Sequence, residues 1–330
     1  MDNLYFIVQQ LLYFSIPILI VALGGMFSER SGIVNIALEG IMLFGAFLGI
    51  ITVNLIQAGQ STEVLANVAS GQWVLLIGLL VAGVTGALFS LLHAYASINM
   101  KADQVISGTA LNLIAPAVAI YVARLLPITN FTQQISFTGK QFFIRKFPFL
   151  HRIPIIGDMF FKQAYITTYI GILILVVAYI FLYKTKLGLR LRACGEHPQA
   201  ADAAGINVAR MRYLGVILSG LLGGMGGFIL IITTQTEFNA SVFGYGFLAL
   251  AVLIFGQWKP IRILAVAIFF GFMNTISSAY SSIPFLDRIG APAELYKMIP
   301  FVATLLVLSF TSVNSLAPRA AGEIYDAGKR

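Results

Sequence analysis

Residues 172–183 read ILILVVAYIFLY, and this stretch decides the fold class because it has no polar face in any direction. A transmembrane β-strand alternates apolar and polar residues over about ten positions, so this pattern excludes a membrane barrel. Only a helix satisfies its own backbone hydrogen bonds in lipid without closing a barrel. The stretch therefore predicts a transmembrane helix.

Similar apolar stretches recur along all 330 residues, and with the first they cover residues 4–27, 33–56, 73–96, 105–126, 165–183, 213–234, 244–258, 261–282 and 295–315. The composition agrees, because 58% of the residues are hydrophobic and only 10% are charged. A soluble domain is about a quarter charged, whereas this content allows about nine or ten crossings of about 20 residues each. We therefore predict an all-α, polytopic membrane helix bundle with 9–10 transmembrane helices, in a single domain over residues 1–330.

The basic residues predict the orientation of the bundle. Cytoplasmic loops are enriched in Lys and Arg. With nine crossings and the N-terminus outside, most of the 21 Lys and Arg residues lie inside, namely Arg30, Lys101, Lys184, Lys186, Arg190, Arg192, Arg210, Arg212, Lys259, Arg262, Arg319, Lys329 and Arg330. Residues 184–212 are then cytoplasmic, and residues 127–164 form an outer loop that is either a plain connection or a docking surface. A tenth helix remains open, because the Gly-interrupted stretch 33–57 has room for two short helices. The net charge of +8 is thus explained by topology rather than by nucleic-acid binding.

Catalytic motifs are missing from the sequence. The pairs Gly139-Lys140 and Gly328-Lys329 lack the preceding glycine and the following Ser or Thr of a phosphate-binding loop. No metalloprotease motif or nucleophile elbow is present, and one Cys with three scattered His residues gives neither a disulfide framework nor a metal site. We expect no catalytic residue, no metal and no cofactor in this chain. If ATP drives it, a partner binds the ATP.

The cytoplasmic stretch contains a short helix signal. Pro198 suits the first helical position, the alanines at 200, 201, 203 and 204 are strong helix formers, and Gly205 suits the stop position. A helix with such small side chains lets a partner's cleft close tightly on it. A solvated loop with one helical turn is the alternative.

Four stretches of the sequence resemble those of a known protein family. The stretch GLRLRACGEHPQAADAAGINVAR (188–210) resembles the coupling segment of ATP-binding-cassette importer permeases, in the branch for branched-chain amino acids, simple sugars and nucleosides. The stretches FSERSGIVNIALEGIMLFGAF (27–47), ADQVISGTALNL (102–113) and GYGFLALAVLIFGQWKP (244–260) resemble the same branch, and the pattern is most similar to the nucleoside and simple-sugar permeases.

The resemblance implies a type II importer permease subunit in the bacterial cytoplasmic membrane, for nucleosides or else simple sugars. It also implies a separate ATPase, an extracellular substrate-binding lipoprotein, and a second, similar permease that forms a heterodimer with this chain or else is a copy of it. Carried over by position, the ATPase-coupling residues are Gly195, Glu196, Ala200, Ala201, Asp202 and Gly205. The rival functions are an ion-coupled secondary transporter, for which only Glu39 is a fair protonatable candidate, an intramembrane enzyme and a channel.

Polar residues inside apolar stretches are candidates for the translocation pathway, because they are costly in lipid. We select Asn35, Glu39, Asn112 and Asn274. Each has a structural alternative, since membrane Asn side chains often bond a neighbouring helix. Glu39 is too far from Arg30 for a pair on one helix, so its partner should lie on another helix, either at a helix break or in the pathway.

Glycines give two further indications. The Gly-interrupted stretches NIALEGIMLFGAF and GYGFLALAVLIFGQW lie in opposite halves, and corresponding broken segments point to a central pathway. The run GLLGGMGG (220–227) predicts either close helix packing or a moving gate.

Overall fold

The computed structural model describes residues 2–60, 67–126, 132, 134–146, 156–280, 292–311 and 316–326. Seven described helices are long and apolar enough to cross a membrane. They are α1 (Asp2–Arg30), α2 (Leu38–Ala58), α4 (Val68–Ala94, continued by the π-helical turn Tyr95–Asn99), α5 (Gln104–Leu125), α7 (Ile166–Lys184), α10 (Val208–Thr234) and α12 (Pro260–Ala279). The predicted polytopic helix bundle is confirmed.

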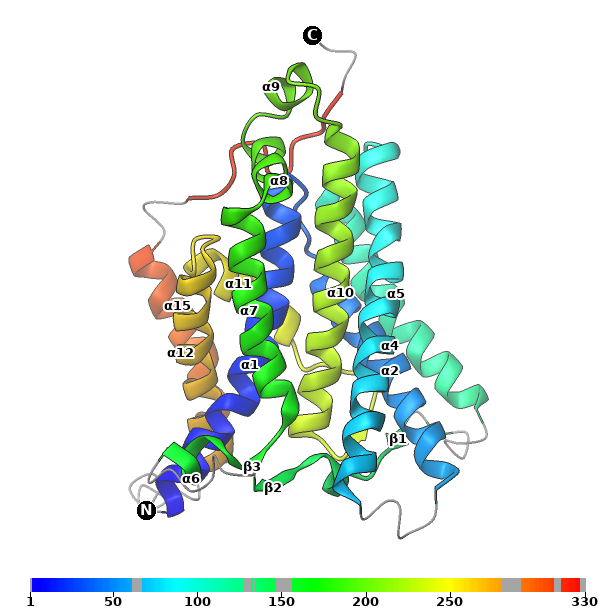
Figure 1. Ribbon diagram of the computed structural model, residues 1–330, viewed down its shortest axis with the longest axis vertical. Helices are drawn as coiled ribbons and strands as arrows, with labels where there is room; N and C mark the ends of the chain where they lie inside the picture. The colour runs from blue at the N-terminus through cyan, green and yellow to red at the C-terminus, as the bar shows by residue number, and fades with distance from the viewer. Residues whose placement is uncertain are drawn as a thin grey trace.

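The bundle has two distinct ends (Figure 1). At one end lie the short helices α8 (Lys186–Glu196) and α9 (Pro198–Ala203) with residues 316–326, and by the distribution of basic residues this is the cytoplasmic end. The N-terminus and the short elements of the loop 127–164 lie at the opposite, outer end. The structure therefore places these two segments at opposite ends of the bundle, and the assignment of the cytoplasmic end stays a prediction from the basic residues.

Two shorter helices complete the bundle in the part of the chain that the structure describes: α11 (Tyr245–Phe255) and α15 (Ile299–Thr311). With the seven long helices they give nine, and residues 38–58 form one helix, so the predicted alternative of two short helices there is wrong. The helix predicted over 295–315 lies partly outside the described residues. That the chain forms one domain over 1–330 stays a prediction.

Helix α10 is the centre of the packing. It packs most extensively on α4 and α1, and then on α2. Its glycines 220, 223, 224, 226 and 227 are all buried. A Cβ added at any of these five positions would fall within 3.0 Å of an atom of a neighbouring helix, so only glycine fits. The run GLLGGMGG therefore serves close helix packing, as one of the two predicted readings has it.

The outer loop contains little regular structure. Its elements are β1 (Ile135–Ser136), a 3-10 turn (Gly139–Phe142), β2 (Ile144–Lys146), α6 (Ile156–Phe160) and β3 (Lys162–Ala164). Strand β1 pairs antiparallel with β4 (Glu237–Phe238), and β2 pairs antiparallel with β3. The Gln57 amide also bonds both backbone groups of Thr138, which ties the loop to the end of α2. The remaining short helix, α14 (Ala293–Lys297), precedes α15.

Two helices begin inside the bundle instead of at its surface. The stretch predicted as a helix over 33–56 is non-helical until Leu38, and the one predicted over 244–258 is helical only over Tyr245–Phe255. At 1.5 Å per residue, an 11-residue helix is about 17 Å long, roughly half of a hydrocarbon core of about 30 Å. Figure 1 shows α11 in the half of the bundle nearer the cytoplasmic end.

Candidate functional site

The candidate coupling segment, residues 184–212, contains the predicted helix. Helix α9 starts with Pro198 at its first position and ends at Ala203, and Gly205 follows with a left-handed φ of +77°. The Gly205 N–H donates to the Asp202 carbonyl, and the Ile206 N–H donates to the Ala201 carbonyl. These bonds close the helix end in the way that a glycine stop allows. The pattern of Pro, Ala and Gly therefore predicted both ends of this helix.

The six coupling candidates fall into two groups by burial. Ala201 is only 4% exposed, in an apolar cluster with Cys194 and Val208, whereas Ala200 and Gly205 are exposed. Asp202 is half-buried. Burial also raises the pKa of the Cys194 thiol, so this side chain remains a protonated part of the cluster at neutral pH. The exposed face of α9 therefore carries small residues, and its buried face packs on the apolar cluster of Cys194 and Val208.

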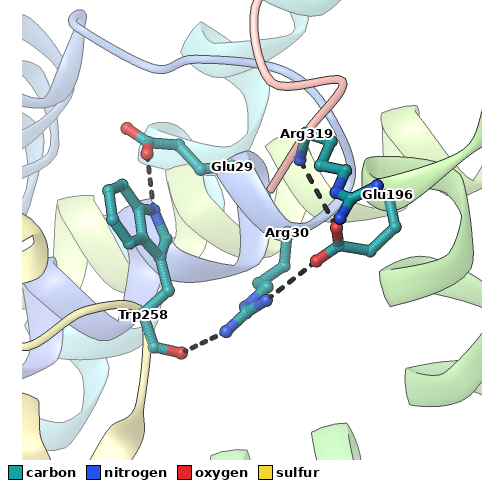
Figure 2. A network of polar contacts seen from close by, with 5 residues as sticks. All are labelled: Glu29, Arg30, Glu196, Trp258 and Arg319. Atoms are coloured by element: carbon teal, nitrogen blue, oxygen red, sulfur yellow. Dashed lines mark hydrogen bonds and ion pairs between the residues drawn. The ribbon is translucent and has the colours of Figure 1, made fainter. Parts of the chain in front are cut away.

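The base of the segment is joined to the end of α1 (Figure 2). An added Cβ at Gly195 would fall against the Arg30 carbonyl, so the two backbones are in close contact here. Arg30 Nη1 lies 3.4 Å from Glu196 Oε1, and Arg30 Nη2 donates to the Trp258 carbonyl at 3.2 Å. Gly195 is buried in this contact, and the partly exposed Glu196 joins the segment to the bundle through its ion pair with Arg30.

Trp258 brings a third element into this junction. It follows α11, and its indole Nε1 donates to Glu29 Oε2 at 2.6 Å, with both side chains buried. Figure 2 shows Arg30 between the Trp258 carbonyl and Glu196. The cytoplasmic ends of α1, α8 and α11 are thus linked by Arg30 and Glu196, which sequence reasoning named, and by Glu29 and Trp258, which it did not. A Trp after an apolar run gave no signal of a carboxylate 229 residues away.

Residues 31–37 connect α1 to α2 outside both helices. The N–H groups of residues 31–33 make turn hydrogen bonds to the end of α1, and side chains bond the backbone groups that follow. His93 Nε2 lies 3.0 Å from the Val34 carbonyl, and Gln104 accepts from the Val34 N–H at 2.7 Å. Asn112 donates to the Ile36 carbonyl at 2.9 Å and accepts from the N–H of Gly40 at 2.8 Å. These side-chain hydrogen bonds satisfy backbone groups that would otherwise be unpaired in the membrane, where an unpaired group is costly.

Asn35 lies within the same connection and is fully buried. Its amide donates to the Ser219 hydroxyl on α10 at 2.9 Å, and its oxygen accepts from the Ala37 N–H. Asn35 and Asn112 are therefore brought together as supports of one helix break. A contact of either residue with substrate stays a prediction.

Glu39 joins the two interior helix starts. Its carboxylate lies in the first turn of α2 and accepts from the N–H of Gly244 at 2.9 Å and of Gly246 at 2.7 Å, at the start of α11. A carboxylate at a helix N-terminus satisfies unpaired N–H groups and complements the helix dipole. Its partner lies on another helix, as the sequence suggested. The two Gly-interrupted stretches are thus in direct contact.

The fourth pathway candidate lies beside this junction. Asn274 of α12 accepts from the Tyr245 hydroxyl at 3.2 Å and donates to the Phe270 carbonyl at 3.0 Å. Next to Tyr245, Phe243 and Phe247 are 47% and 50% exposed, and Gly244 is exposed as well. We call Phe243, Gly244 and Phe247 the pathway face.

Comparison with known proteins agrees with this architecture. The family described as "Branched-chain amino acid transport system / permease component" matches residues 7–308. The guanosine ABC transporter permease protein NupQ of Bacillus subtilis is 41% identical, over 98% of this chain and 97% of its own length. The nucleoside ABC transporter permease protein NupC of Lactococcus lactis is 39% identical, over 99% of both chains. The putative glucose ABC transporter permease protein TsgC13 of Haloferax volcanii is 29% identical, over 92% of this chain and 91% of its own.

No solved structure matches the chain. The family match and the two relatives near 40% identity cover nearly the whole length, and the described helices form a multi-pass membrane bundle. These relatives are transporter permease subunits and not enzymes. The chain therefore belongs to the family of permease components of branched-chain amino acid-type transport systems.

Proposed function

We propose that this chain is a permease subunit of an ATP-driven importer of nucleosides in the bacterial cytoplasmic membrane. The supporting observation for the substrate is that two relatives named for guanosine and nucleosides are 41% and 39% identical, whereas the relative named for glucose is 29% identical. Simple sugars are the second candidate. In this proposal a separate ATPase binds ATP, a second permease completes the pathway, and a substrate-binding lipoprotein delivers the nucleoside from outside.

One geometric observation supports a transport pathway along the pathway face. Residues 239–244 are non-helical, Gly244 is exposed, and α11 begins about 17 Å from its cytoplasmic end. Irregular backbone at membrane depth is tolerated only against protein or a water-filled cavity, because lipid cannot satisfy its polar groups. The pathway face therefore borders the aqueous pathway or the second permease. Binding sites between broken helices are a general feature of transporters.

Uptake measurements test the substrate. In cells that carry the complete transporter, we expect labelled guanosine to accumulate, to persist when ion gradients are collapsed, and to stop when ATP is depleted. An excess of unlabelled ribose or glucose should leave guanosine uptake unchanged. Competition by sugar but not by other nucleosides would favour the sugar alternative, and dependence on an ion gradient would favour a secondary transporter.

The outward face of α9 is the proposed contact with the ATPase. Ala200→Trp adds bulk on this exposed face while leaving the buried side of the helix intact. We expect co-purifying ATPase to fall about tenfold, which corresponds to about 1.4 kcal/mol of lost binding free energy. Uptake should fall with it, while the amount of folded permease stays unchanged.

The matched control is Ala58→Trp, which places the same bulk at an exposed alanine at the outer end of α2. It should leave ATPase association at the wild-type level. Ala201→Trp is a second comparison, because Ala201 is buried and its replacement should disturb the folding of the segment. Full ATPase association and uptake in the Ala200→Trp variant would contradict the proposed docking face.

A further inference from the structure

The segment 316–326 returns to the cytoplasmic end after the last helix and lies beside α8 and α9 (Figure 1). We call it the C-terminal strap. Its composition gives no helix or strand signal, yet Pro318 and Ala320 are buried. A terminal segment remains ordered only when specific contacts tie it down. The contacts of the strap are therefore informative.

The first contacts bind the strap to the base of the coupling segment and to the start of the helix break. The Ala320 N–H donates to the Gly195 carbonyl at 2.9 Å, and the Arg319 N–H lies 3.5 Å from Glu196 Oε2. Two residues later, the Gly322 N–H donates to the Gly32 carbonyl at 3.1 Å. Figure 2 shows Arg319 meeting Glu196 on the side away from Arg30.

The next contacts involve Arg212, in the first turns of α10. This side chain is only 2% exposed, its Nη1 donates to the Glu323 carbonyl at 3.0 Å, and its guanidinium carbon lies 5.8 Å from the centre of the Tyr325 ring. Tyr325 also packs on the apolar cluster of Cys194, Ala201 and Val208 beneath α9. The strap thus covers a buried arginine and fills the space under the coupling helix.

The last contact is an ion pair on the far side of α10. Lys101 Nζ, in the turn between α4 and α5, lies 2.9 Å from Asp326. Along 316–326 the strap therefore touches the coupling segment, residue 32, α10 and the turn before α5. These are the elements that carry or support the connection 31–37, which leads to Glu39 and the pathway face.

We propose that the C-terminal strap transmits the movement of the coupling segment to the connection 31–37, so that ATPase movement opens and closes the pathway. This inference rests on the proposed function, because it needs an ATPase docked on α9. The direct link between the coupling segment and α1 includes a 3.4 Å ion pair whose Glu196 side chain is 42% exposed. The strap adds backbone hydrogen bonds between the coupling segment and Gly32, which do not depend on side-chain rotamers. Two packed states of such a connected network can couple distant sites.

The first experiment removes residues 316–330 from the permease of the complete transporter reconstituted in liposomes. Guanosine uptake, ATP hydrolysis and the amount of bound ATPase are measured on the same preparation. We expect ATPase binding and hydrolysis to persist, and uptake per ATP hydrolysed to fall about tenfold, a usual size for coupling between sites. A parallel fall of uptake and hydrolysis, with an unchanged ratio, would mean that the strap only stabilises the fold and would overturn the proposal.

A second set of variants avoids any loss of folding. Lys101→Asp and Asp326→Lys each replace the attraction by a repulsion at a partly exposed pair, and Lys101 has a left-handed φ of +52°, which Asp tolerates. Each single variant should lower uptake per ATP about twofold, and the double swap should restore it. A wild-type ratio of uptake to ATP hydrolysis in both single variants would refute the proposed role of the strap.

The outcomes distinguish this inference from the proposed function. If the wild-type permease binds no ATPase or takes up no nucleoside, the proposed function fails, and the strap proposal, which rests on it, fails with it. If the wild type is active and either the deletion or both single variants keep the wild-type ratio, the strap proposal alone fails.

Discussion

Replacing Gly224 by alanine is expected to destabilise the helix bundle strongly, because the added methyl group has no space against α4. The new Cβ would fall against the Ala82 carbonyl oxygen, 3.0 Å from the carbonyl carbon of Ala82 and 3.1 Å from the Cα of Gly86. All of these are backbone atoms of α4, so no side chain can rotate away. The helices would have to separate, at a cost of about 2 to 3 kcal/mol in the free energy of unfolding.

Helix propensity alone would make Gly224→Ala stabilising, because alanine is more favourable than glycine in a helix by about 1 kcal/mol. A decrease in stability therefore indicates a steric clash. Gly59→Ala is the matched control, since Gly59 follows α2 with φ of −87° and its nearest neighbour to an added Cβ is the Ile56 oxygen at 3.8 Å. Thermal unfolding of the purified protein in detergent should show a lower midpoint for Gly224→Ala and an unchanged or higher one for Gly59→Ala. A higher midpoint for both would mean that close packing at Gly224 is not what holds α10.

The extent to which the fold could be predicted follows from the physics of lipid. A helix such as 166–184 needs only its own apolar residues, so its sequence predicted it almost to the residue. The start of α2 needs partners that are distant in sequence. The side chains that support residues 34 and 36, on His93, Gln104 and Asn112, are 59, 70 and 76 positions away. No local pattern shows such a helix break.

The candidate site was predictable to the same degree. Pro198 and Gly205 mark the ends of α9 by local chemistry, so this helix was found from sequence, while its coupling role stays a prediction. Which of its alanines faces outward depends on Cys194, Val208 and Tyr325 beneath it, and Tyr325 lies more than a hundred residues away. Glu39 was selected because a carboxylate is costly in lipid, but its partner N–H groups are backbone atoms 205 and 207 positions away, which no side-chain motif records.

Replacing Glu39 by glutamine is expected to separate the two interior helix starts. Each carboxylate oxygen accepts one N–H, from Gly244 and from Gly246. Glutamine keeps one acceptor oxygen, but its NH₂ group faces the other backbone N–H. Two donors then face each other, and that backbone N–H is left without an acceptor. The loss is about 2 kcal/mol, which lowers the population of the joined arrangement more than tenfold. Guanosine uptake should fall accordingly, with the permease still bound to its ATPase.

Glu237→Gln is the matched control, because Glu237 is an exposed carboxylate in β4 whose acceptor role toward Gln134 an amide oxygen can keep. It should retain wild-type uptake and thermal stability. If Glu39→Gln is equally silent, the carboxylate is not needed to hold α11 beside α2. If Glu39→Gln loses uptake but keeps its thermal midpoint, Glu39 acts on the substrate pathway. If both fall together, the bond between the two helix starts is itself what keeps the pathway face formed, at a point where an added Cβ at Gly246 would fall against the Glu39 backbone.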